Sequence, residues 1–119
     1  MIANRWVLLE HRISQLSPEN VHFDLLLEES LSCKTWRLEE IPVLDGPWIS
    51  AILLPSHRLE WLEKQESIVS GGRGWARRIE GGFFSGQLTA ESDSISVVIT
   101  SETISGKLEI IKNQCRLLS

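Results

Sequence analysis

The sequence predicts an all-β protein, a small antiparallel β-barrel with at most short helices. Apolar and polar residues alternate with a period of two along most of the chain, and short segments of this kind follow one another between turn residues. Only residues 58–65 have the pattern of a helix, and that segment is short. Many short strands at regular spacing are typical of a sandwich or a barrel.

The expected strands are taken in order along the chain. Residues 6–11 form a compact apolar segment, and residues 21–28 (VHFDLLLE) place apolar side chains at every odd position, which is a strong strand pattern. Turn residues are densest at GGRG (71–74) and EGG (80–82). The other expected strands are residues 33–38, 48–54, 74–80, 83–89, 94–100, 106–112 and 114–118.

Length and composition indicate one domain, residues 1–119. A chain of 119 residues that is 42% hydrophobic and 24% charged can bury a core of its own. No stretch reaches the roughly 18 apolar residues of a membrane helix, and the first residues lack the features of a signal peptide. We therefore expect a cytoplasmic protein with no membrane partner, a monomer in which Cys33 and Cys115 are reduced core thiols.

The charge balance argues against a general nucleic-acid binder. Twelve Lys and Arg residues against sixteen Asp and Glu residues leave a net charge of −4, whereas non-specific binders usually carry a basic excess. A local exception is GGRGWARR (71–78), in which Arg73, Arg77 and Arg78 surround Trp75. These side chains can contact phosphate and stack on a base. The alternative is a hairpin whose outward residues are arginines.

Two histidines and an aspartate form a candidate metal site. His22 and Asp24 lie two apart in an expected strand, so their side chains point to the same side of the sheet. His11 ends the preceding strand and approaches His22 if the two strands pair. Two imidazoles and one carboxylate on a rigid sheet leave coordination positions open, as catalytic metal sites do. The alternative is a solvated sheet face.

Six segments resemble, in the same order, motifs of the 3′-phosphoesterase domain of bacterial DNA ligase D. Each motif is moderately specific alone, and six in order, over roughly residues 5–112, are hard to obtain by chance. The pairs are WVLLEH (6–11) with an FVVQKH-like opening, HFDLLLE (22–28) with HYDFRLE, KTWRLEEIP (34–42) with KSWAVPKGP, SHRLEW (56–61) with DHPLDY, SIVSGGRG (67–74) with TIPEGEYG, and SGKLEIIK (105–112) with KGRFALVR.

The resemblance implies a compact β-barrel with a manganese-dependent active site. By position in the motifs, His11, His22 and Asp24 would bind the metal, and His57 would contact phosphate or act as a general acid. The implied reaction removes a 3′-phosphate or a 3′-terminal ribonucleotide from a primer end during DNA repair. The implied partner is therefore the 3′ end of a nucleic acid.

The chain departs from the family inside the implied site. Leu26 stands where the family has an arginine, and leucine offers phosphate no hydrogen-bond donor. Leu26 is expected on the same face as His22 and Asp24, facing a common cavity. Trp61 replaces a tyrosine, and His11 and His22 are eleven positions apart, more than in the family.

These departures leave other functions open. A non-catalytic, metal-binding barrel could bind a nucleic-acid or protein partner, and the loss at Leu26 favours this function. A third hypothesis is an iron oxygenase that uses His22, Asp24 and His57 as its facial triad. In a nucleic-acid-binding protein, Trp61 and the arginines of residues 71–78 are the candidate contacts to phosphate or base.

Overall fold

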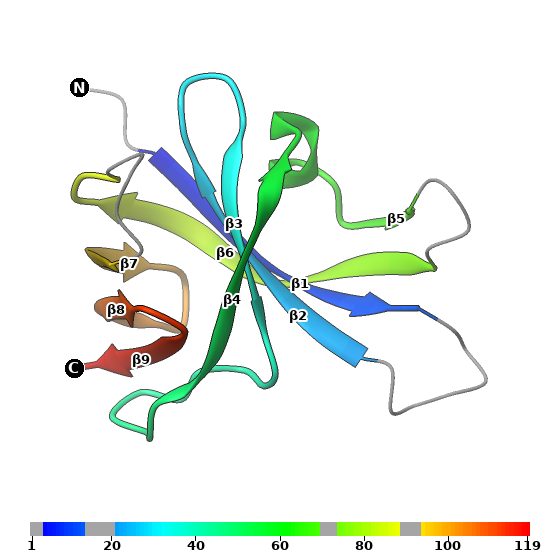
Figure 1. The fold of residues 1–119 in the computed structure, drawn as a ribbon. Helices are drawn as coiled ribbons and strands as arrows, with labels where there is room; N and C mark the ends of the chain where they lie inside the picture. The colour runs from blue at the N-terminus through cyan, green and yellow to red at the C-terminus, as the bar shows by residue number, and fades with distance from the viewer. Residues whose placement is uncertain (1–3, 14–20, 70–73, 89–93) are drawn as a thin grey trace.

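The computed structural model describes residues 4–13, 21–69, 74–88 and 94–119, which form one antiparallel sheet (Figure 1). The predicted helix over residues 58–65 is a single turn of 3-10 helix, η1 (Leu59–Leu62). None of the described helical residues belongs to a segment that is long and apolar enough to cross a membrane. The all-β prediction is confirmed. The strands are β1 (Asn4–Arg12), β2 (Val21–Glu28), β3 (Cys33–Leu38), β4 (Ile49–His57), β5 (Glu66–Ile68), β6 (Trp75–Ser85), β7 (Ser94–Thr100), β8 (Ser105–Ile111) and β9 (Gln114–Leu118).

Pairing between β1 and β6 closes the sheet into a ring. The hydrogen-bonded order is β1-β2-β3-β4-β9-β8-β7-β6-β5, and β1 also pairs with β6 along its whole length. Eight strands therefore complete the ring, while β5 pairs with β6 at the end of the order. In Figure 1 the three strands β7, β8 and β9 lie together at the left, away from β5 and η1.

Strand β6 is one continuous strand, although the sequence predicts two strands separated by EGG. Gly81 and Gly82 lie inside it. A side chain at Gly82 would overlap the carbonyl oxygen of Thr100, so glycine lets the neighbouring chain approach closely. The β1–β6 register also shifts by one residue, which leaves Ile79 unmatched and forms a β-bulge. These glycines therefore mark a bend in a strand and not a turn.

The inner face of the ring holds the main hydrophobic core. Strand β7 shows the cause, because its residues alternate strictly between exposed and buried. Trp6 and Trp36 are both buried there, whereas Trp48 stacks under the Arg116 guanidinium at 4.3 Å. The core comprises Trp6, Leu8, Leu25, Leu27, Trp36, Leu38, Ile49, Ala51, Phe84, Ile95, Val97, Ile99, Leu108, Ile110, Cys115 and Leu117.

A second, smaller cluster covers the outer face of β1 and β2. Turn η1 contributes Leu62 to it, with Leu59 and Trp61 packed against it. The first strands of the chain are therefore buried on both faces. We call this group the outer cluster; it comprises Val7, Leu9, Leu26, Cys33, Leu62 and Ala76.

We predict that neither cysteine reacts in the folded protein. Cys33 and Cys115 are buried free thiols, and burial raises the pKa of each to about 12. Because the thiolate is the nucleophile, we expect no reaction with Ellman's reagent at about pH 8, and two equivalents after unfolding. Rapid labelling of the native protein would contradict this.

The same pKa shifts predict alkaline destabilisation. Unfolded thiols ionise near pH 8.5, whereas the folded thiols stay protonated to about pH 12. The unfolded state therefore binds fewer protons in this window, so the free energy of unfolding should fall as the pH rises through it.

Candidate functional site

The candidate site lies on the outer face of β1, β2 and β3, beyond the end of the outer cluster. In the β1–β2 register His11 is opposite His22, and in the β2–β3 register Asp24 is opposite Arg37. Directly opposite residues of antiparallel strands project to the same face. Strand pairing therefore gathers these four side chains on one face of the sheet.

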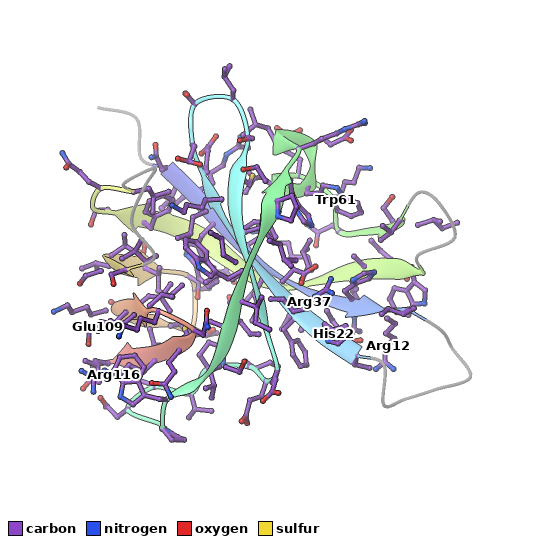
Figure 2. All side chains as sticks on the ribbon, in the orientation of Figure 1. Arg12, His22, Arg37, Trp61, Glu109 and Arg116 are labelled. Carbon is purple, nitrogen blue, oxygen red and sulfur yellow. The ribbon has the colours of Figure 1, made fainter. Side chains whose placement is uncertain are left out.

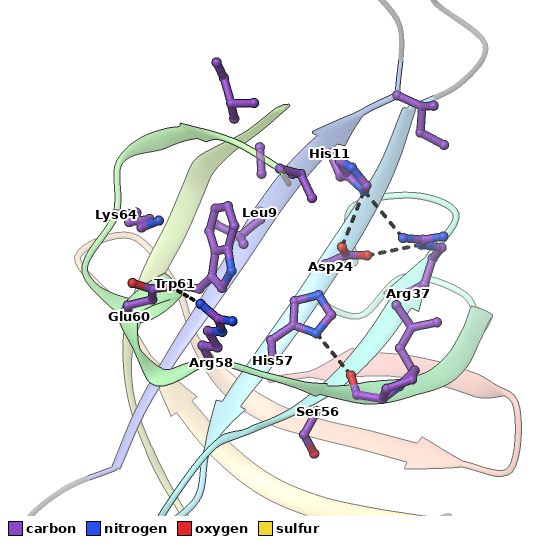
Figure 3. Close-up of a pocket in the computed structure, with 16 residues that line it drawn as sticks. Leu9, His11, Asp24, Arg37, Ser56, His57, Arg58, Glu60, Trp61 and Lys64 are labelled. Carbon is purple, nitrogen blue, oxygen red and sulfur yellow. Dashed lines mark hydrogen bonds and ion pairs between the residues drawn. The ribbon is translucent and has the colours of Figure 1, made fainter. Parts of the chain in front are cut away.

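Asp24, Arg37 and His11 contact one another (Figure 3). Arg37 Nε donates a hydrogen bond to Asp24 Oδ1 at 3.3 Å, and His11 Nδ1 lies 3.8 Å from Asp24 Oδ2. Arg37 Nη2 lies 3.4 Å from His11 Nδ1. A guanidinium only donates, so this last contact uses the lone pair of His11 Nδ1. The Asp24 carboxylate is 4% exposed, and the Arg37 charge compensates its burial.

His22 lies beside this group and is not among the described residues that line the pocket. It is half-buried near the start of β2, close to Arg12 in Figure 2. Burial lowers the pKa of His22, the positive charge of Arg37 lowers it further, and Asp24 partly offsets both effects. These effects together favour the neutral form of the His22 imidazole.

A pocket of about 660 Å³ opens over Asp24 and Arg37. His57, at the end of β4, forms part of the opposite wall, and Figure 3 shows its ring between Trp61 and Asp24. The contact of His57 Nδ1 with the Pro55 carbonyl oxygen, at 3.1 Å, makes Nδ1 the donor. In the neutral ring, Nε2 is then the nitrogen with a lone pair.

Turn η1 and the residues around it form the side wall of the pocket. Trp61 lies against the outer cluster and lines the pocket, with Lys64 Nζ 4.6 Å from its ring centroid. Arg58 lines the rim and pairs with Glu60 at 3.6 Å. An aromatic ring, two histidines and three cationic side chains therefore surround one cavity.

The described arginines of the basic segment 71–78 do not supply these cations. Arg73 lies outside the described residues. Arg77 pairs with Glu10 at 3.3 Å, and Arg78 donates to the carbonyl oxygen of Leu62 at 3.1 Å. Neither arginine is among the described residues that line the pocket. The hydrogen bond of Arg78 instead links β6 to the last residue of η1.

Leu26 corrects one expectation about the site. It lies on the same face of β2 as Asp24, as predicted, but it is fully buried in the outer cluster and does not face the cavity. The reason is that Leu62 and its neighbours in η1 cover this part of the sheet. The position of the family arginine is therefore apolar core in this chain.

Arg37 is the site residue that the sequence did not reveal. It stands in KTWRLEEIP (34–42), one of the six segments, at a position to which the resemblance assigns no role in the site. Its role follows from the β2–β3 register, in which it is the direct neighbour of Asp24. The sequence signal that could have identified Arg37 is the short connection over residues 29–32. If it is a hairpin turn, its length sets the register of the two strands and places Arg37 opposite Asp24.

The manganese site implied by the resemblance needs His11, His22 and Asp24 around one ion. Within the described ranges, no group of three His, Cys, Asp or Glu side chains is arranged to hold a metal. Only His11 and Asp24 approach each other inside the pocket, and Arg37 lies against both. The residues as placed do not fit the ion, and the manganese site stays a prediction.

We predict that Leu26→Arg destabilises the protein instead of restoring a phosphate contact. The new charge would be buried without a partner in the outer cluster, at a cost of about 3–5 kcal/mol. Urea unfolding should show this loss. The control Leu31→Arg, at a side chain that is 89% exposed, should leave the unfolding midpoint unchanged. Equal midpoints for both variants would contradict the burial of Leu26.

The sequence matches no family model and no curated protein.

Proposed function

We propose that the chain is a diverged relative of the ligase D 3′-phosphoesterase domain, built on a small β-barrel. Its pocket binds the phosphate at the 3′ end of a DNA or RNA strand. The observation that carries this proposal is the placement of His57 across one cavity from Asp24, Arg37 and His11. His57, His11 and Asp24 are three of the four residues that the motifs single out, and the fourth, His22, is not among the described residues that line the pocket.

The side chains of the pocket suit a phosphate monoester. A guanidinium has five N–H groups, and the contacts of Arg37 to Asp24 and His11 engage two of them. The other N–H groups can bind phosphate oxygens in the fork geometry that arginine favours. His57, Arg58 and Lys64 line the same cavity and add donors or positive charge.

Trp61 gives the pocket a surface for the terminal nucleotide. An aromatic side chain at the edge of a cationic cavity can stack on a base of any identity. The net charge of −4 limits contacts with the rest of the strand, because strong backbone binding needs a basic surface. These features support recognition of a strand end and disfavour a long binding track.

The geometry of the pocket favours binding of a 3′ end over its catalytic cleavage. In the ligase D family, catalysis depends on a manganese ion that polarises the phosphate. In this chain Arg37 contacts Asp24 and His11, two of the residues that the resemblance implies as ligands of that ion. The family motif also has alanine where this chain has Arg37. We therefore expect removal of a 3′-phosphate or 3′-ribonucleotide to be weak, and the non-catalytic alternative gains support.

We predict that a short single-stranded DNA with a 3′-phosphate binds at least about tenfold more tightly than the same strand with a 3′-hydroxyl, because only the phosphate meets Arg37. Fluorescence anisotropy measures both affinities. Arg37→Met and His57→Ala should each remove the preference.

Arg116→Met is the matched control. Arg116 pairs with Glu109 as Arg37 pairs with Asp24, and the two arginine side chains are 34% and 30% exposed. Arg116 does not line the pocket, so this variant should keep the preference. Equal affinity of the wild type for both strands would refute the proposed function.

A further inference from the structure

We propose that the Arg37 guanidinium is the resident cation of the pocket and takes the place of a divalent metal ion. The pocket then receives an oxyanion without a metal. Only the identity of that anion, a phosphate monoester, rests on the proposed function. The exclusion of the metal follows from the contacts of Arg37 and from the partners of the neighbouring acidic and imidazole groups, and does not depend on the proposed function.

Asp24 is the reason that a cation must be present. Its side chain is only 6% exposed, and a carboxylate taken out of water needs a compensating charge. Arg37 is its direct neighbour across the β2–β3 pair, and that backbone register fixes where the guanidinium can reach. The compensating charge is therefore covalently part of the chain.

A divalent ion would need His11 Nδ1, which Arg37 already contacts, and one oxygen of the Asp24 carboxylate, whose other oxygen accepts a hydrogen bond from Arg37. Metal bonds to a carboxylate oxygen and an imidazole nitrogen are about 2.0–2.2 Å long. An ion between Asp24 Oδ2 and His11 Nδ1, which are 3.8 Å apart, would lie next to the guanidinium. Arg37 contacts the same two side chains at 3.3 and 3.4 Å. Repulsion between two cations this close, in a partly buried site, opposes binding of the ion.

The other acidic and imidazole groups nearby do not supply a replacement. His22 is not among the described residues that line the pocket. Glu10 pairs instead with Arg12 at 2.7 Å and with Arg77 at 3.3 Å. In the part of the chain that the structure describes, an ion at this position would have two protein ligands and a cation as its neighbour.

Titration with Mn²⁺ alone tests the proposal, with free Mn²⁺ followed by electron paramagnetic resonance. We expect no saturable site in the wild type or in Arg116→Met. Arg37→Met keeps most of the apolar stem and removes the charge. It should gain one saturable Mn²⁺ site, at least about tenfold tighter than any residual binding by the wild type, and the additional change Asp24→Asn should abolish that site.

Thermal unfolding gives a second readout. Mn²⁺ should raise the Tm of Arg37→Met and leave that of the wild type unchanged, because only a ligand of the folded state stabilises it. Arg37→Gln is the second variant, should the methionine variant fail to give the native far-UV circular dichroism spectrum.

Two results of the metal titration would overturn the proposal. One is that the wild-type protein binds one Mn²⁺ at a site that is lost in Asp24→Asn. This result is decisive without any Arg37 variant. The other is a folded Arg37→Met or Arg37→Gln protein that binds Mn²⁺ no better than the wild type. Binding of the 3′-phosphate strand in the presence of EDTA is measured separately. If that strand binds only with Mn²⁺, the proposed function survives and the metal-free site does not.

Discussion

The structure depends on β1 being paired along both edges and covered on both faces. Its hydrogen bonds to β2 and to β6 close the ring, so the sheet has no free edge there. Trp6 and Leu8 point into the ring while Val7 and Leu9 point into the outer cluster. Side chains at the end of this strand are therefore held by a backbone that cannot shift register without exposing one of the two cores.

The site begins where the outer cover ends. Along the outer face of β1, Val7 and Leu9 lie in the outer cluster, and the next residue on that face is His11. Along β2 the same change occurs between Leu26 and Asp24. Polar groups at this boundary are close to apolar packing and are still open to the cavity, so they lose part of their hydration. Partial loss of water strengthens the attraction between Asp24 and Arg37 compared with an exposed pair.

Local pattern was sufficient for the fold class and for most strands, because a half-buried strand must alternate. It failed at Gly81 and Gly82, where a close approach between strands, and not a turn, requires glycine. It also failed at Leu26, since alternation says which residues share a face but not whether another element covers that face. Arg37 was missed for a related reason: its partner is set by the pairing of two strands, which no single segment encodes.

Leucine at position 26 and arginine at position 37 are physically coherent choices. At position 26 a guanidinium would lie under η1, where Leu62 and its neighbours exclude water, so a charge there would have no compensating partner. At position 37 it lies directly opposite the buried carboxylate that needs a charge and still reaches the cavity. An outer cluster that buries residue 26 therefore prevents an arginine at that position from reaching the cavity. Position 37, directly opposite Asp24 on the neighbouring strand, lies beyond that cover, and the contact with Asp24 orients the guanidinium there.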